Sequence, residues 1–287
     1  MNSGTRTYPS PHTGRTSPTS GSDGVRELTH STAYAALARA GLIARGVVFG
    51  VIGVLALKLA LGSGGKTTSQ QGALATIAGE PFGAVLLVAV AVGLAGYAFW
   101  RLVCAAVGPR DSADDGVGER VPALASGIVY AALCFTALKI LLGGHATSGG
   151  SNPKHATAGV LGWPGGPVLV TIAGVVLICV GLYQGYEGVA RKFCEEARTE
   201  QMGPGMRRSY TALGVFGYLA RMVVFVLVGY GLIKAALDYD PHKAIGLDGA
   251  LQQLAHSPYG PALLGIVAAG LIGFALYCIA DARYRRL

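Results

Sequence analysis

Apolar residues gather in six long runs that are separated by polar connections. Several of these runs reach the roughly 20 residues that an α-helix needs to cross the hydrocarbon core of a bilayer. The predicted fold is therefore all-α, a polytopic integral membrane protein. We predict its six transmembrane helices at residues 38–61, 82–104, 122–142, 167–189, 213–237 and 261–282.

One stretch occurs three times along the chain. Residues 45–58 (RGVVFGVIGVLALK) return as residues 126–139 (SGIVYAALCFTALK) and as residues 221–234 (RMVVFVLVGYGLIK). Each copy has an aromatic residue four positions after its start and ends on a lysine. A repeat of this length indicates duplicated structural units that pack side by side. The chain is thus predicted to be three tandem helical hairpins.

The repeats divide the chain into a tail and three membrane units. Residues 1–33 are rich in Ser, Thr, Gly and Pro, a composition that cannot bury enough apolar surface to fold. They are predicted to form a disordered cytoplasmic tail, and they lack the apolar core of a signal peptide. The membrane hairpins are predicted at residues 34–108, 120–190 and 210–287.

A second repeated feature lies between the two long helices of a hairpin. Residues 71–79 (QGALATIAG) resemble residues 248–257 (DGALQQLAHS), and each segment is followed by a turn that contains proline and glycine. We predict that both segments are short helices at the outer surface of the membrane.

Composition and charge agree with a membrane protein. Hydrophobic residues make up 52% of the chain and charged residues 13%, whereas soluble domains carry about 25% charge. Fifteen lysines and arginines lie in the N-terminal segment, the second and fourth connections and the C-terminus; the other connections hold only Lys66, Lys154 and Lys243. By the positive-inside rule, both termini are predicted to be cytoplasmic (N-in/C-in). This placement of the net charge of +8 argues against nucleic-acid binding.

The repeated motifs resemble those of a known family. An arginine, GVV, an aromatic residue and LALK in residues 45–58 are followed by GAL at 72–74, PFG at 81–83 and GLAGYAFWR at 93–101. This pattern resembles the bacterial membrane family called domain of unknown function 1206, over residues 38–287 and most closely in the first hairpin. The resemblance implies three tandem two-helix units in a bacterial plasma membrane. It implies no established activity, cofactor or catalytic residue.

The lysine that ends each copy is a candidate functional residue. Lys58, Lys139 and Lys234 stand near the outer ends of their predicted helices. Each ammonium group can extend along its helix to the membrane interface. Alternatively, the three lysines form a ring around a pseudo-three-fold axis that attracts anions or gates a pathway. Both interpretations stay open, because descent from one ancestral hairpin would repeat the lysine in either case.

Four charged residues near the inner helix ends are further candidates. We predict an ion pair between units, Arg45 with Glu187, and one within the third unit, Arg221 with Asp281. Arginine and carboxylate groups form bidentate pairs where water is scarce. Such pairs would tether the helices. A proton or ion relay, and simple exposure to the cytoplasm, are the alternatives.

No catalytic, cofactor or metal site is predicted. His145, His155, His242 and His256 lie in predicted outer connections beside several aspartates, but their spacing is irregular and no HxxH motif occurs. The five cysteines include no CxxC and lie outside the predicted outer connections, so a disulfide framework is not expected.

The abundant glycine indicates close helix packing. Pairs such as Gly46 and Gly50, Gly93 and Gly96, and Gly214 and Gly217 form small faces on the predicted helices. Small residues let membrane helices approach closely. These faces are predicted to pack within the monomer, with an oligomer contact as the alternative.

Two functional classes remain. The first is a non-enzymatic membrane scaffold or accessory subunit, whose partners are the lipid bilayer and a membrane protein or a second copy of the chain. The second is a permeation protein for a small ion or solute. A lipid-modifying enzyme is a weaker hypothesis, because no catalytic constellation is visible. A polar cavity that joins the three lysines to the inner arginines would favour permeation, and a packed centre would favour the scaffold.

Overall fold

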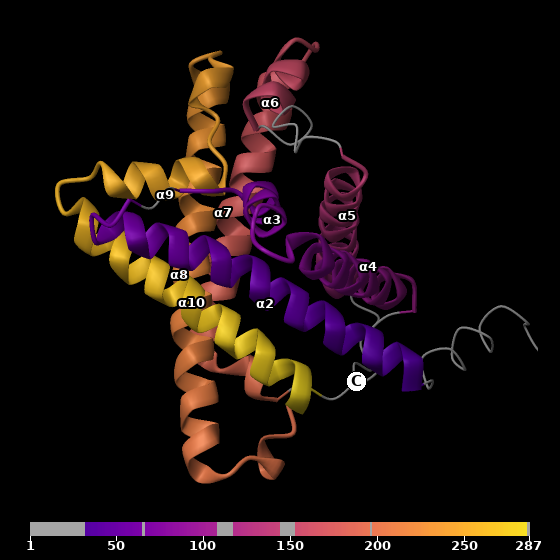
Figure 1. Cartoon of the computed structure of the whole chain (residues 1–287). Helices are drawn as coiled ribbons and strands as arrows, with labels where there is room; N and C mark the ends of the chain where they lie inside the picture. Colours follow the sequence, from indigo (N-terminus) through magenta and orange to yellow (C-terminus); the bar gives the residue numbers. More distant parts are fainter. Residues whose placement is uncertain (1–31, 65–66, 108–116, 144–152, 196, 286–287) are drawn as a thin grey trace, which may run out of the picture.

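The computed structural model describes residues 32–64, 67–107, 117–143, 153–195 and 197–285. The predicted tail lies almost wholly outside these ranges. The regular elements of the described residues are helices, with one isolated bridge between Ala197 and Arg285. Each unit contains a long helix, a nine-residue helix and a second long helix (Figure 1).

The nine main helices follow this order without exception. The first unit consists of α2 (Thr32–Ala60), α3 (Gln70–Ala78) and α4 (Gly83–Val107). The second consists of α5 (Val117–Leu141), α6 (Pro153–Leu161) and α7 (Gly166–Ala190). The third consists of α8 (Pro204–Leu237), α9 (Leu247–Ala255) and α10 (Gly260–Tyr284). Single 3-10 turns, η1 (Lys192–Cys194), η2 (Thr199–Gln201) and η3 (Pro241–Lys243), lie in the connections on either side of α8.

The six long helices are those that the apolar runs predicted. Each contains a segment long and apolar enough to cross a membrane: Ala36–Ala60, Gly83–Ala106, Ala123–Leu141, Gly166–Ala190, Pro204–Leu237 and Gly260–Tyr284. The all-α fold is therefore confirmed. The two short helices predicted at residues 71–79 and 248–257 are confirmed as α3 and α9.

The glycine after each proline turn explains why a new helix begins there. Gly83, Gly166 and Gly260 are the first residues of α4, α7 and α10. A Cβ atom on any of them would collide with the carbonyl groups that end the preceding short helix. A residue without a side chain is needed where two backbones approach this closely. The repeated turn therefore presses each short helix against the start of the long helix that follows it.

The long helices pack in an order that joins the three units. The most extensive contacts join α7 to α8, α10 to α2 and α4 to α5, and each of these pairs links two different units. Within units, α2 packs against α4 and α8 against α10. In Figure 1, α2 and α10 lie side by side and α10 crosses α8. Among the described residues α5 and α7 make no comparable contact, so the second hairpin is shared between its neighbours.

Close backbone approaches hold several of these interfaces. A Cβ atom on Gly217 of α8 would lie 2.7 Å from the Cα of Phe274 on α10. One on Gly93 of α4 would lie 2.7 Å from a carbonyl oxygen of α2, and one on Gly46 of α2 would lie 2.9 Å from a carbonyl oxygen of α10. These glycines therefore pack within the chain, as their spacing predicted.

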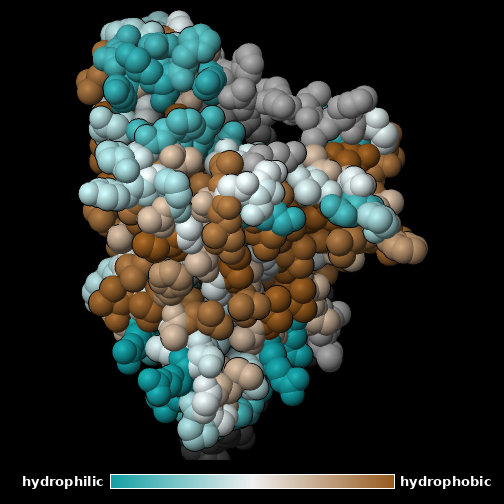
Figure 2. All heavy atoms as spheres, turned by 60° about the vertical axis from the view of Figure 1, so that its left-hand side comes forward, coloured by the Kyte–Doolittle hydropathy of each residue, from teal (hydrophilic) through white to brown (hydrophobic). Residues whose placement is uncertain are grey.

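The surface is apolar in its middle and hydrophilic at its ends. Figure 2 shows a band of hydrophobic residues between hydrophilic residues at the top and the bottom of the molecule. On α7, which contributes heavily to the exposed apolar surface, Val168 and Ile172 are 63% and 54% exposed. A soluble monomer rarely exposes so large a continuous apolar area. The exposed band and the six apolar helices together suggest a multi-pass membrane protein.

We expect Gly217→Ala to lower the free energy of unfolding by about 1–3 kcal/mol, because the added methyl group must push α8 away from the backbone of α10. Thermal unfolding of the purified protein in detergent measures the loss. Gly273→Ala is the matched control, since it adds the same group to a buried glycine of α10 whose nearest neighbour would be 3.6 Å away. That control is expected to raise stability slightly, because alanine favours helix more than glycine does. Equal losses in the two variants would contradict the close approach.

Candidate functional site

Two arginines meet at one aromatic ring in the core of the molecule. Arg45 on α2 and Arg221 on α8 are the first residues of the repeated stretch in the first and third units. The Cζ atom of Arg45 lies 4.8 Å from the centroid of the Phe274 ring on α10, and the Cζ atom of Arg221 lies 4.5 Å from the same centroid. The Phe274 side chain is fully buried. The repeat thus brings its two arginines to a shared contact on a third helix.

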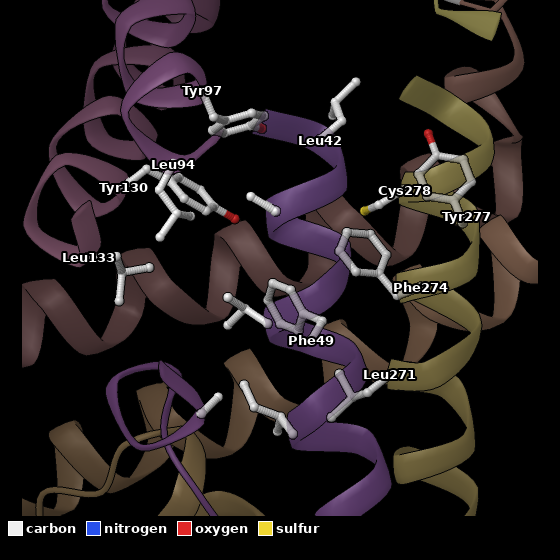
Figure 3. Close-up of a cluster of buried hydrophobic side chains, with 14 of the residues drawn as sticks. Leu42, Phe49, Leu94, Tyr97, Tyr130, Leu133, Leu271, Phe274, Tyr277 and Cys278 are labelled. Carbon is white, nitrogen blue, oxygen red and sulfur yellow. The ribbon is translucent and has the colours of Figure 1, made fainter. Parts of the chain in front are cut away.

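Tyrosines from two further helices surround Arg45. Its Nη1 donates a hydrogen bond of 2.9 Å to the hydroxyl of Tyr97 on α4. Its Cζ lies 5.9 Å from the ring centroid of Tyr130 on α5, and the Tyr97 and Tyr130 rings touch edge to face. Figure 3 shows Tyr97 and Tyr130 on one side of α2 and Phe274 on the other. Tyr130 is the aromatic residue of the second repeat, so all three units reach this centre.

Phenylalanine rings surround Arg221. Its Cζ lies 5.4 Å from the ring centroid of Phe49 on α2 and 5.5 Å from that of Phe225 on α8. Phe49 itself packs edge to face on Phe274, with the centroids 5.2 Å apart. Phe49 and Phe225 are the aromatic residues of the first and third repeats. The aromatic position noted in every copy therefore supplies three of the rings around the two arginines.

Among the described residues, no carboxylate pairs with the positive charges of the two arginines in this centre. The Nε atoms of Arg45 and Arg221 are buried without a hydrogen-bond partner among the described residues. Contact with the face of an aromatic ring stabilises a desolvated cation by about 2 kcal/mol, and several rings contribute here. Arginine stays protonated, so neither residue can serve as a general base. The arrangement is suited to holding helices together and not to proton transfer.

Asp281 has different partners from the one predicted. Its Oδ2 pairs with Nη1 of Arg285 at 2.8 Å, and its Oδ1 accepts a hydrogen bond of 2.9 Å from the hydroxyl of Tyr210. The predicted pair of Arg221 with Asp281 is therefore wrong. Arg285 stands four residues after Asp281, directly after the last residue of α10, whereas Arg221 lies against Phe274. Asp281 is almost completely buried and ties α10 to α8 through Tyr210.

Arg45 also has a different partner from the one predicted, Glu187. Among the described residues no ion pair joins the two, and Arg45 bonds to Tyr97 instead. The reason is the helix order: α2 packs between α4 and α10, whereas α7, which carries Glu187, packs on α8. There the residue after Glu187, Gly188, packs directly against Tyr218.

The three repeat lysines lie at the surface. Lys58, Lys139 and Lys234 all occupy the last turns of their helices, and all three side chains are exposed. A positive charge in the last turn is favoured by the helix dipole. The ammonium group of Lys139 lies 5.1 Å from the ring centroid of Phe135, an exposed residue one turn earlier. A ring formed by the three lysines stays a prediction.

The four predicted outer histidines lie in different places. His145 lies outside the described residues and His155 lies in α6, whereas His242 and His256 are exposed. Within the described ranges, no three His, Cys, Asp or Glu side chains gather in a way that could hold a metal ion. Asp238 accepts a bond of 2.7 Å from Lys243, and this hydrogen bond lowers the pKa of Asp238 below its ordinary value. None of the five cysteines forms a disulfide bond within the described residues.

Sequence reasoning missed the partners of the charged residues. The aromatic position stands four residues after the start of the repeat, a spacing that places Phe225 beside Arg221 on one helix face. Nothing in the sequence showed that Phe49 and Tyr130 would meet an arginine of another unit. Phe274 stands in residues 270–278 (GLIGFALYC) at the position that Tyr97 holds in residues 93–101 (GLAGYAFWR), so a repeat in the second long helix was a signal for both rings. The spacing of four positions between Asp281 and Arg285, at the end of α10, was the local signal for the correct ion pair.

We expect Asp281→Asn to lower the free energy of unfolding by about 3 kcal/mol, because removal of one partner leaves a partly buried arginine without its countercharge. Unfolding of the purified protein in detergent measures the change. Asp248→Asn makes the same substitution at an exposed carboxylate and is expected to change stability by less than about 0.5 kcal/mol. An effect of Asp281→Asn as small as that of the control would show that the buried pair does not stabilise α10.

A comparison with known proteins divides the chain into the same three units. The family described as Domain of Unknown Function (DUF1206) matches the chain three times, at residues 40–108, 121–191 and 216–285. The chain is 34% identical over 251 residues to the uncharacterized protein YxxB of Bacillus subtilis (strain 168), a similarity that covers 87% of this chain and 90% of that protein. No solved structure matches the chain significantly. The chain therefore belongs to the DUF1206 family and carries three tandem copies of its domain.

Proposed function

We propose that the chain is a multi-pass protein of the bacterial plasma membrane and that it acts as a non-enzymatic scaffold or accessory subunit. The observation that carries this proposal is the packed centre around Phe274, where side chains of all three units meet. A centre of this kind fixes the relative positions of the units. It leaves the outer helix faces available to other membrane components.

The arrangement of charges supports the scaffold over a permeation path. A path through the centre would join the three repeat lysines to Arg45 and Arg221 by polar, hydrated space. Two hollows of the described surface have volumes of about 300 Å³ beside α9 and about 830 Å³ beside the N-terminal end of α8. Neither is lined by Lys58, Lys139 or Lys234. The space around the two arginines is instead filled by aromatic rings.

The proposed orientation places both termini in the cytoplasm. Basic residues of the fourth connection and of the C-terminus meet at one end of the molecule, where the backbone N–H of Arg198 donates to the carbonyl of Tyr284 and Ala197 bridges to Arg285. Clustered arginine at helix ends is typical of the cytoplasmic side. The same placement explains the net charge without a nucleic-acid partner.

The exposed apolar faces of α5 and α7 indicate where partners would bind. Only 22% of the membrane-crossing segment of each helix is buried within the chain. In the bilayer these faces contact lipid, a partner membrane protein or a second copy of the chain. A scaffold needs such surfaces, and no catalytic residue or cofactor is part of the proposal.

We expect liposomes that contain the purified protein to conduct protons, potassium, sodium and chloride no faster than protein-free liposomes, because aromatic side chains fill the centre. Ion-selective dyes and electrodes measure the flux. The matched variants are Lys58→Gln/Lys139→Gln/Lys234→Gln and, with the same change in charge, Lys154→Gln/Lys192→Gln/Lys243→Gln. Flux in the unmodified protein that disappears only in the first variant would overturn the scaffold and establish permeation.

A further inference from the structure

A hollow of about 830 Å³ lies where the connection between α7 and α8 folds against the N-terminal turns of α8. Its basic lining residues are Arg191, at the end of α7, and Arg207 and Arg208, in the first turns of α8. One acidic residue, Glu200, also lines it. The hollow therefore carries an excess of positive charge.

The other side of the same hollow is apolar. Met202, Val215, Phe216 and Leu219 are among its apolar lining residues, and the Phe216 side chain is 41% exposed. The arginines and the apolar residues thus face one space. A ligand that fills it would have an anionic group joined to a hydrocarbon chain.

The position along α8 matches the boundary between headgroups and hydrocarbon. The helix has 34 residues, so it is about 51 Å long and exceeds the roughly 30 Å of the hydrocarbon core. Its N-terminal turns therefore extend beyond the core. They lie at the lower end of the molecule in Figure 1, and this end is hydrophilic in Figure 2. Arg208 lies in these turns, whereas Leu219 lies about 16 Å further along the helix, at the depth of acyl chains.

We propose that this hollow binds the headgroup of an anionic phospholipid, with the phosphate between Arg191, Arg207 and Arg208 and an acyl chain along Phe216 and Leu219. Guanidinium groups bind phosphate oxygens in a bidentate geometry. Basic hollows between helices at the cytoplasmic surface are suited to anionic headgroups. The site depends on the proposed membrane location but not on the scaffold role, which the flux experiment tests separately.

The backbone conformation of Arg191 allows a substitution that removes a cation from the hollow without weakening the fold. Arg191 has φ 58° and ψ 27°, in the left-handed region that glycine adopts more readily than any other residue. Its backbone N–H caps α7 by donating to the carbonyl of Gly188. Glycine at this position keeps that cap and relieves the strain, while it removes one of the three cations. Arg191→Gly is thus a variant that folds at least as well as the native chain.

The test is the affinity of the full-length protein in a neutral detergent for dioleoyl phosphatidylglycerol, measured by native mass spectrometry. Dioleoyl phosphatidylcholine and inorganic phosphate are the comparison probes. We expect phosphatidylglycerol to bind at least tenfold more tightly than phosphatidylcholine. A basic residue near an anionic lipid surface contributes about a fivefold increase in affinity. Arg207→Gln/Arg208→Gln should therefore bind phosphatidylglycerol about 30-fold more weakly, and Arg191→Gly about fivefold more weakly with an unchanged or higher melting temperature.

The matched control is Lys192→Gln/Arg198→Gln. Both residues are exposed in the same connection, neither lines the hollow, and the change in charge equals that of the arginine pair. We expect this control to change the affinity by less than twofold. An equal loss in the control and in Arg207→Gln/Arg208→Gln would overturn the site, because the attraction would then be general. Competition by inorganic phosphate at the same concentration as the lipid would also overturn it and would identify a site for free phosphate.

Discussion

The structure depends on two guanidinium groups that share the ring of Phe274. Arg45 and Arg221 bring like charges into the core, where each would be costly on its own. The rings of Phe49, Phe225, Tyr97 and Tyr130 complete the surroundings, and each ring face attracts a cation. Because the two arginines come from different units, the requirement for one shared ring fixes α10 beside both α2 and α8. Of the other long helices, α4 packs on α2 and α7 on α8, and α5 packs in turn on α4.

The ring shared by the two arginines also explains why the three units pack differently. The first and third units begin their repeated stretch with arginine and pack closely on each other through α2 and α10. The second unit has Ser126 at that position and contributes only Tyr130 to the centre. Its two long helices accordingly lie apart, α5 on α4 and α7 on α8. A three-fold sequence repeat has therefore produced a structure in which one hairpin is divided between its neighbours.

The architecture was predictable from the sequence, whereas the side-chain partners were not. Apolar runs of membrane-crossing length identify helices directly, and the copies at residues 45–58, 126–139 and 221–234 revealed the units. Pairing of Arg221 with Asp281 was inferred from balanced charges, but an ion pair depends on which helices are neighbours. Asp281 found a nearer partner in Arg285 and a hydroxyl in Tyr210. Similarly, the sequence analysis used Arg207 and Arg208 only to predict the orientation of the chain in the membrane. The folded connection places both residues with Arg191 around one hollow.

The central claim is that Phe274 stabilises the fold chiefly through the two arginines. The most direct test compares Phe274→Leu in the native chain with the same change in an Arg45→Met/Arg221→Met background, by reversible unfolding in detergent. We expect a loss of about 3 kcal/mol in the free energy of unfolding of the native chain, because two desolvated cations lose a ring face. In the background without the guanidinium groups, the loss should fall to about 1 kcal/mol, the cost of an ordinary apolar replacement. Equal losses in the two backgrounds would show that Phe274 acts only as a packing residue and would contradict the account.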